Sequence, residues 1–104
     1  MTALTKLECR GIEGIVLSDY DEGAINRCVW TWSANLFSKK ATFSGVISSL
    51  VKKGYVKAYE DGKDSTLTLL AAGWAAYKAA PAEFKDPKVD VAELDRIDVL
   101  RRQS

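Results

Sequence analysis

The fold of this chain is decided by residues 39–54, which read KKATFSGVISSLVKKG. Apolar side chains recur along this stretch at the spacing of one helix face, namely Phe43, Val46, Ile47, Leu50 and Val51. Ser38 stands before the stripe as the expected N-cap, and Gly54 follows where helices often end in a left-handed residue. The pattern predicts an amphipathic helix over residues 39–53.

The residues after this helix predict a β-hairpin and a further helix. Residues 55–59 and 65–70 are rich in strand formers, and Asp61-Gly62 between them is a turn signal. The alanine-rich residues 71–80 continue as a helix, which Pro81 ends.

The flanking segments are also mainly helical in pattern. Residues 3–19 predict an amphipathic helix, residues 28–30 a short extended piece, and Thr31 the N-cap of a short helix through Phe37. Residues 89–102 predict a last helix. We expect one domain over residues 1–80 and a helical C-terminal extension over residues 81–104.

The apolar positions of these segments define an expected core. Its predicted members are Leu7, Ile15, Val29, Trp30, Leu36, Phe43, Val46, Ile47, Leu50, Val51, Val56, Leu67 and Leu69.

Composition restricts the function classes. The 104 residues include 15 basic and 14 acidic side chains, two cysteines and no histidine. The absence of histidine removes the commonest general base and zinc ligand, so we expect no enzyme, no catalytic residue, no metal and no cofactor. No leader or membrane-spanning run is visible, which predicts a cytoplasmic protein.

The near-neutral total hides an uneven charge distribution. Residues 23–59 hold six basic side chains and no acidic one, whereas the acids gather on both sides of this block. A basic block of this kind indicates association with a polyanion, although chance clustering on a solvated face is the alternative interpretation.

Two motifs resemble a known family. Residues 42–56, TFSGVISSLVKKGYV, resemble the recognition-helix run of winged helix-turn-helix regulators of the MarR-like kind, and residues 67–73, LTLLAAG, are similar to the segment that follows the wing. The resemblance spans residues 29–79. It implies an α+β winged helix-turn-helix with a three-helix core, a β-hairpin wing and C-terminal helices, whose partner is double-stranded DNA and whose role is transcription regulation.

The resemblance and the charge pattern together give a set of candidate DNA-binding residues. Residues 39–53 would enter the major groove and residues 57–64 would touch its flank as the wing. The candidates are Thr31, Ser33, Lys39, Lys40, Ala41, Thr42, Ser44, Gly45, Ser48, Ser49, Lys52, Lys57 and Lys63. The expected recognition helix departs from common base readers because it contains no arginine.

The sequence is also compatible with partners other than double-stranded DNA. A winged helix can instead be a protein-interaction module, an adaptor or an inhibitor that does not bind DNA. Residues 89–102 are the candidate surface for a homodimer, with simple packing on the domain as the alternative. Single-stranded nucleic acid, stacked on Trp30, Trp32 and Tyr59, is a third and weaker hypothesis.

Overall fold

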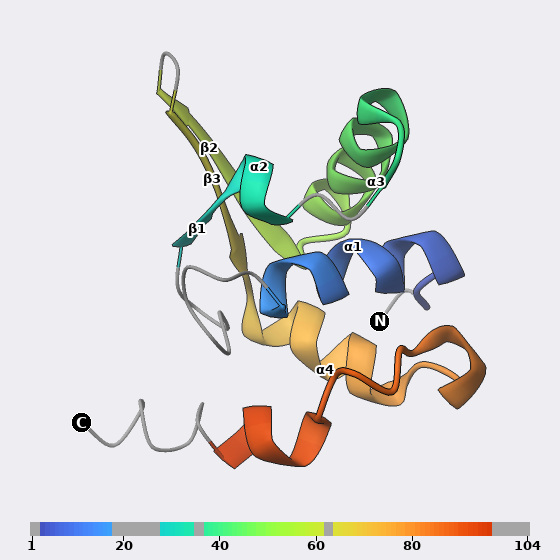
Figure 1. Cartoon of the computed structure of the whole chain (residues 1–104). Helices are drawn as coiled ribbons and strands as arrows, with labels where there is room; N and C mark the ends of the chain where they lie inside the picture. Colours follow the sequence, from blue (N-terminus) through green and yellow to red (C-terminus); the bar gives the residue numbers. More distant parts are fainter. Residues whose placement is uncertain (1–2, 18–27, 35–36, 62–63, 97–104) are drawn as a thin grey trace.

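The chain folds as a small α+β domain in which helices pack on one three-stranded antiparallel sheet (Figure 1). The computed structural model describes residues 3–17, 28–34, 37–61 and 64–96. Its elements are α1 (Lys6–Val16), β1 (Cys28–Trp30), α2 (Thr31–Ala34), α3 (Lys40–Lys52), β2 (Val56–Asp61), β3 (Asp64–Leu69), α4 (Ala71–Ala79) and the short 3-10 helix η1 (Ala82–Phe84). Residues 91–96 are also helical.

The sheet has the strand order β1-β3-β2, and both pairings are antiparallel. Val56 lies opposite Leu69, and Val29 lies opposite Leu67. All four side chains are buried, so this face of the sheet covers the core. The predicted hairpin is confirmed, and its far end extends beyond the helices (Figure 1).

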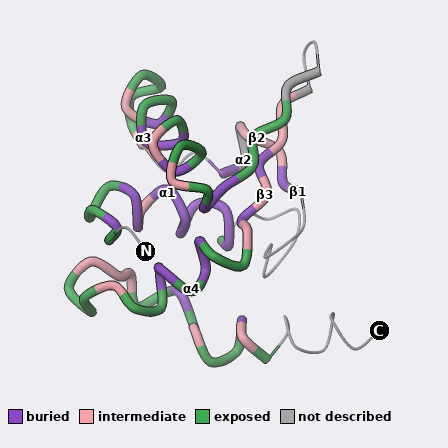
Figure 2. Tube along the Cα trace, turned by 180° about the vertical axis from the view of Figure 1, so that it is seen from behind, coloured by how far each residue is buried: buried purple, intermediate pink, exposed green. Residues whose placement is uncertain are grey.

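Helix α1 lies at the centre of the domain and begins with a capping box. The Thr5 hydroxyl accepts from the Glu8 backbone N–H, and the Glu8 carboxylate accepts from the Thr5 backbone N–H. Buried residues gather where α1, the base of the hairpin and α4 meet (Figure 2). Gly11 permits a close crossing with α3, because a Cβ there would lie 2.8 Å from Cγ1 of Val46.

Helix α3 confirms the predicted amphipathic helix, but its N-cap and the exposure of Val51 differ from the prediction. The N-cap residue is Lys39, with no side-chain hydrogen bond, so the prediction of a Ser38 cap is wrong. Gly54 has φ +79° and gives the expected left-handed end. Val51 is 41% exposed, because the buried side of α3 is centred on Phe43, Val46, Ile47 and Leu50.

Four further expectations differ from the structure or lie outside it. Leu7 is 54% exposed although Glu8 and Cys9 beside it are buried, because it lies on a side of α1 that is turned away from the core. Thr31 is the first residue of α2 rather than its cap, and Trp30 is only half-buried. Leu36 lies outside the described residues.

The segment after α4 packs back on the helices. Val89 and Leu94 belong to the same buried core as α1 and α3. The indole N–H of Trp74 donates to Asp95 (2.7 Å), and Lys78 pairs with the same carboxylate. Of the predicted helix 89–102, residues 91–96 are helical, and residues 97–102 lie outside the described part of the chain.

Within the described ranges, no helix has the length and apolar character needed to cross a bilayer.

Candidate nucleic-acid interface

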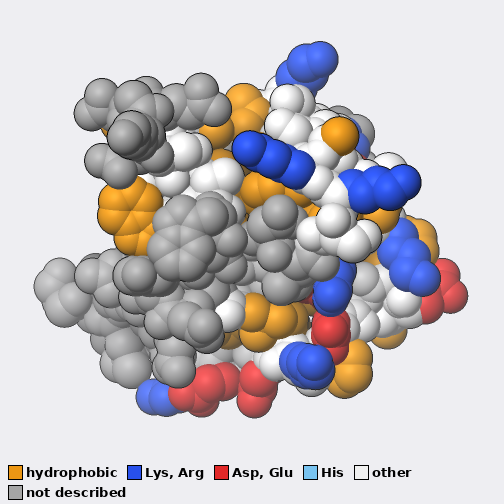
Figure 3. Space-filling view, turned by 45° about the horizontal axis from the view of Figure 1, so that its top comes forward, with side chains coloured by type: hydrophobic (Ala, Val, Ile, Leu, Met, Phe, Trp, Pro, Cys, Tyr) orange, Lys and Arg blue, Asp and Glu red, His pale blue; other side chains and the backbone are white. Residues whose placement is uncertain are grey.

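The outward face of α3 brings together most of the predicted site residues. Opposite the buried stripe the helix exposes small and basic side chains, and Lys39 precedes them at its start. We define the outward face as Lys39, Lys40, Ala41, Ser44, Gly45, Ser48 and Lys52, all of which are exposed. Lys and Arg side chains lie across the upper right of the view without Asp or Glu between them, whereas basic and acidic side chains are mixed in the lower part (Figure 3).

The charge of this face is uniformly positive. No acidic residue occurs from Phe37 to Tyr59, and the structure describes every residue of that range. Lys39, Lys40 and Lys52 have no carboxylate partner within the described parts of the chain. These cations are therefore available to an anionic ligand without the loss of an internal ion pair.

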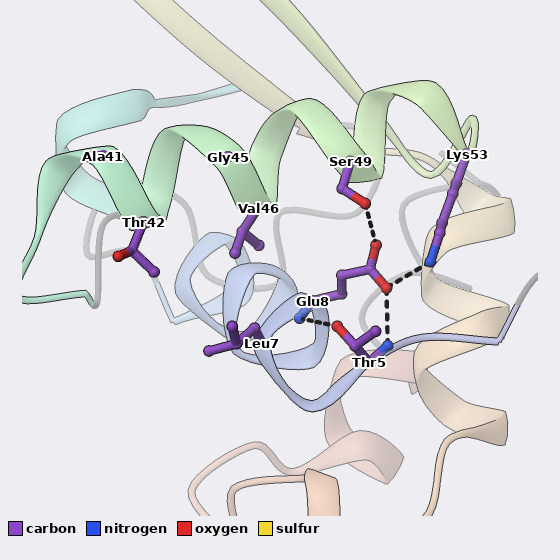
Figure 4. Close-up of a pocket in the computed structure, with 9 residues that line it drawn as sticks. All are labelled: Thr5, Leu7, Glu8, Ala41, Thr42, Gly45, Val46, Ser49 and Lys53. Atoms are coloured by element: carbon purple, nitrogen blue, oxygen red, sulfur yellow. Dashed lines mark hydrogen bonds and ion pairs between the residues drawn. The ribbon is translucent and has the colours of Figure 1, made fainter.

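The flank of α3 that faces α1 is tied to a buried carboxylate (Figure 4). The Ser49 hydroxyl donates to Oε2 of Glu8 (2.6 Å), and Lys53 Nζ donates to Oε1 (2.6 Å). We refer to Glu8, Ser49 and Lys53 as the α1–α3 clasp. Ser49 is among the predicted DNA-binding residues, but its hydroxyl donates inward to Glu8 and does not belong to the outward face.

The clasp keeps Glu8 ionised although the residue is only 3% exposed. Burial alone would raise the pKa of Glu8, but donation from Lys53, from Ser49 and from the Thr5 backbone N–H outweighs it and lowers the pKa below its ordinary value. A charged clasp fixes α3 against α1, and so fixes the direction in which the outward face points.

A shallow hollow lies between the first turn of α1 and α3, beside the clasp (Figure 4). Its volume is about 360 Å³, and Leu7 and Val46 line it from opposite helices. Thr42 also lines this hollow and is half-buried, so it lies at the flank of α3 rather than at the centre of the outward face.

The hairpin and α2 hold the remaining predicted residues. Lys57 is exposed on β2 and lies opposite Thr68, on the sheet face that does not carry the buried side chains of Val56 and Leu69. The Thr31 hydroxyl shares a hydrogen bond with the Ser65 hydroxyl (2.7 Å) and is half-buried. The side chain of Ser33 and the whole of Lys63 lie outside the described residues.

Sequence reasoning missed Glu8, the residue that orients the site. Its signal was present as Thr5-Lys6-Leu7-Glu8, which has the spacing of a capping box. The spacing predicts the contact with Thr5, but the partners Ser49 and Lys53 lie far along the chain and leave no local pattern.

Cys9 is a buried free cysteine of α1. Burial, together with the negative charge of Glu13, raises the pKa of the Cys9 thiol to about 11, which disfavours the reactive thiolate. The described residues contain no group of three or more Cys, Asp or Glu side chains that could hold a metal ion. Comparison with known proteins found no matching family model, no similar curated protein and no similar solved structure.

Proposed function

We propose that this protein is a winged helix-turn-helix that binds double-stranded DNA, with α3 in the major groove and the β2–β3 hairpin as the wing at its flank. The proposal extends to a role in transcription regulation on the resemblance to MarR-like regulators alone. The observation that carries the proposal is the outward face of α3, which is exposed and free of acidic residues. Its lysines have no ion-pair partner among the residues that the structure describes.

The arrangement of elements supports the proposal. The short helix α2 is followed by α3, and α3 by the hairpin β2–β3, which is the order of a helix-turn-helix with a wing. Strand β1 pairs with β3 beside the hairpin, so the hairpin base is anchored to the domain while its far end is free to reach a ligand (Figure 1).

Gly45 gives steric support. A glycine inside a helix costs about 0.5–1 kcal/mol relative to alanine. Packing within the protein explains the glycines at positions 11 and 73, because a Cβ at either position would collide with neighbouring atoms. At Gly45 a Cβ would meet nothing within 4 Å. Packing inside the protein therefore does not require a glycine at position 45. Close approach of the helix backbone to the floor of a DNA groove would require one.

The test is binding to a fluorescent random duplex of 20 or so base pairs at several salt concentrations. If α3 contacts the phosphates, affinity falls steeply with salt, and Lys40→Glu with Lys52→Glu lowers it by tenfold or more. Lys88→Glu is the matched control, because Lys88 is exposed on the C-terminal segment, which lies across α1 and α4 from α3 (Figure 1). Wild-type protein that binds no duplex at low salt contradicts the proposal.

A second candidate function is a protein-interaction module, and the hollow beside α3 favours it. Leu7 is 54% exposed at this hollow, where an apolar side chain of a partner would be shielded from water. In that case Leu7→Glu abolishes association with the partner, whereas the lysine reversals on α3 leave it unchanged. Co-purification with the wild-type and variant chains distinguishes the two functions.

A further inference from the structure

We infer that the duplex is held mainly through its phosphates and that α3 reads the bases weakly, so that the ligand is double-stranded DNA of broadly any sequence rather than one operator. The inference rests on the proposed function and specifies its ligand class. It follows from the kinds of side chain that the structure places on the outward face, and from the kinds it places elsewhere.

Strong base discrimination uses planar side chains with two hydrogen-bonding atoms. Arginine contacts guanine in this way, and asparagine or glutamine contacts adenine. No arginine, asparagine or glutamine occurs in residues 39–52 or in the described residues of the hairpin. One well-placed bidentate contact discriminates by about ten- to a hundredfold between bases, and α3 supplies no such contact.

The arginines that the structure describes are engaged elsewhere. Arg10 of α1 pairs with Asp86 (3.4 Å), and Arg96 of the C-terminal segment pairs with Glu93. The chain's other candidates for planar contacts are outside the described residues; they are Asn26, Arg27, Asn35, Arg101, Arg102 and Gln103.

The polar groups that α3 does expose discriminate poorly. Ser44 and Ser48 each offer one hydroxyl, which donates or accepts and therefore suits any base edge. A third hydroxyl, that of Ser49, already donates to Glu8. The lysine ammonium is a compact charge without directional preference, which suits phosphate oxygens.

The free cations set the expected size of the electrostatic contribution. Lys39, Lys40 and Lys52 on the outward face, with Lys57 on β2, give about four phosphate contacts at most. Each contact contributes about 0.9 to the slope of log affinity against log salt. A slope of about −3 to −4, equal for all sequences, is therefore expected.

The experiment combines selection from a random duplex library with titration of individual duplexes. We expect no dominant enriched motif and affinities within about tenfold among AT-rich, GC-rich and mixed duplexes. Lys40→Ala and Lys52→Ala should weaken binding to every duplex by the same factor, since phosphate contacts carry no sequence information. Lys88→Ala is the control, and thermal unfolding of each variant verifies that its fold is retained.

The outcomes of this experiment distinguish failure of the inferred sequence tolerance from failure of DNA binding itself. Binding with one enriched motif preferred by more than a hundredfold overturns this inference and leaves the proposed function standing. A lysine variant that weakens one duplex class much more than another also overturns it, because that lysine would then read bases. Absence of binding to every duplex overturns the proposed function and the inference together.

Discussion

At the scale of single residues, two helical glycines have opposite surroundings. A Cβ at Gly73 would lie 2.3 Å from the Tyr55 carbonyl oxygen, which is backbone and cannot turn away, whereas a Cβ at Gly45 would meet nothing. Gly73→Ala should therefore destabilise the protein by about 1–3 kcal/mol. Gly45→Ala should stabilise it by about 0.5–1 kcal/mol through helix propensity. Urea unfolding measures both, and equal effects of the two changes would contradict the described packing.

The Glu8 carboxylate makes stability depend on pH in a defined direction. Its pKa is lower in the folded protein than the ordinary value of about 4.3, so the folded state binds fewer protons in that range. The stabilisation is present above about pH 4.3 and is lost as the pH falls through the folded pKa. Glu8→Gln should cost about 1–3 kcal/mol at neutral pH, because hydrogen bonds to a charged group are removed.

Unfolding of wild type and Glu8→Gln at several pH values between 7 and 3 measures this effect. The difference between them should narrow below about pH 4. Glu93→Gln is the control, because the Glu93–Arg96 pair is exposed and screened by solvent, so its loss should affect stability less than Glu8→Gln does. A difference that stays constant down to pH 3 would show that Glu8 does not act through its charge.

At the scale of elements, one side of α3 is buried and the other is exposed, so a change on the exposed side can test the proposed binding without disturbing the fold. Gly45→Leu adds bulk on the outward face and removes a helix-weakening glycine, so stability should be retained or increased. DNA affinity should fall by about tenfold or more if the backbone must approach the groove floor. Fluorescence anisotropy with Gly45→Ala as the smaller control measures this, and unchanged affinity of Gly45→Leu would exclude close approach at that position.

Local sequence patterns predicted the helices but not the exposure and contacts of every side chain on them. The stripe in residues 39–53 predicted α3 because a helix buries one face whatever its neighbours are. The same stripe wrongly included Val51, because periodicity gives the direction of a face but not its width. Leu7 has the pattern of a core residue, yet it lies on a side of α1 that is turned away from the core. The inward turn of Ser49 depends on Glu8, 41 positions earlier in the chain, and no local pattern reports it.

At the scale of the whole molecule, the C-terminal segment is part of the folded unit. Leu94 is 9% exposed against the core, whereas Leu7 is 54% exposed. Leu94→Ala should cost about 2 kcal/mol, at the lower end of the range for large-to-small core changes, and Leu7→Ala less than about 0.5 kcal/mol. Thermal or urea unfolding of the two variants compares them directly, and the reverse order would contradict the packing of residues 81–96.

Packing of this segment on the domain was one of the two alternatives that the sequence offered, but the contacts that attach it were not predictable. The buried carboxylate of Glu13 accepts from the Tyr77 hydroxyl (2.8 Å) and from the Asp86 backbone N–H. These two hydrogen bonds join α1 to α4 and to the connection after η1. Burial and the nearby Glu13 raise the pKa of Tyr77, so its hydroxyl remains a donor. The sequence gives a glutamate inside an amphipathic helix, and only the tertiary arrangement shows what it contacts.

The sheet pairing also implies an order of events during folding. The hairpin β2–β3 joins neighbouring segments across a short turn, whereas β1 reaches β3 through the pairing of Cys28 with Thr68, about forty positions apart. Closing the longer loop costs more chain entropy before any contact is gained. The hairpin and α3 can therefore form early, and the docking of β1 completes the sheet late. Backbone amides of β1 should accordingly lose hydrogen-exchange protection in partial unfolding before those shared by β2 and β3.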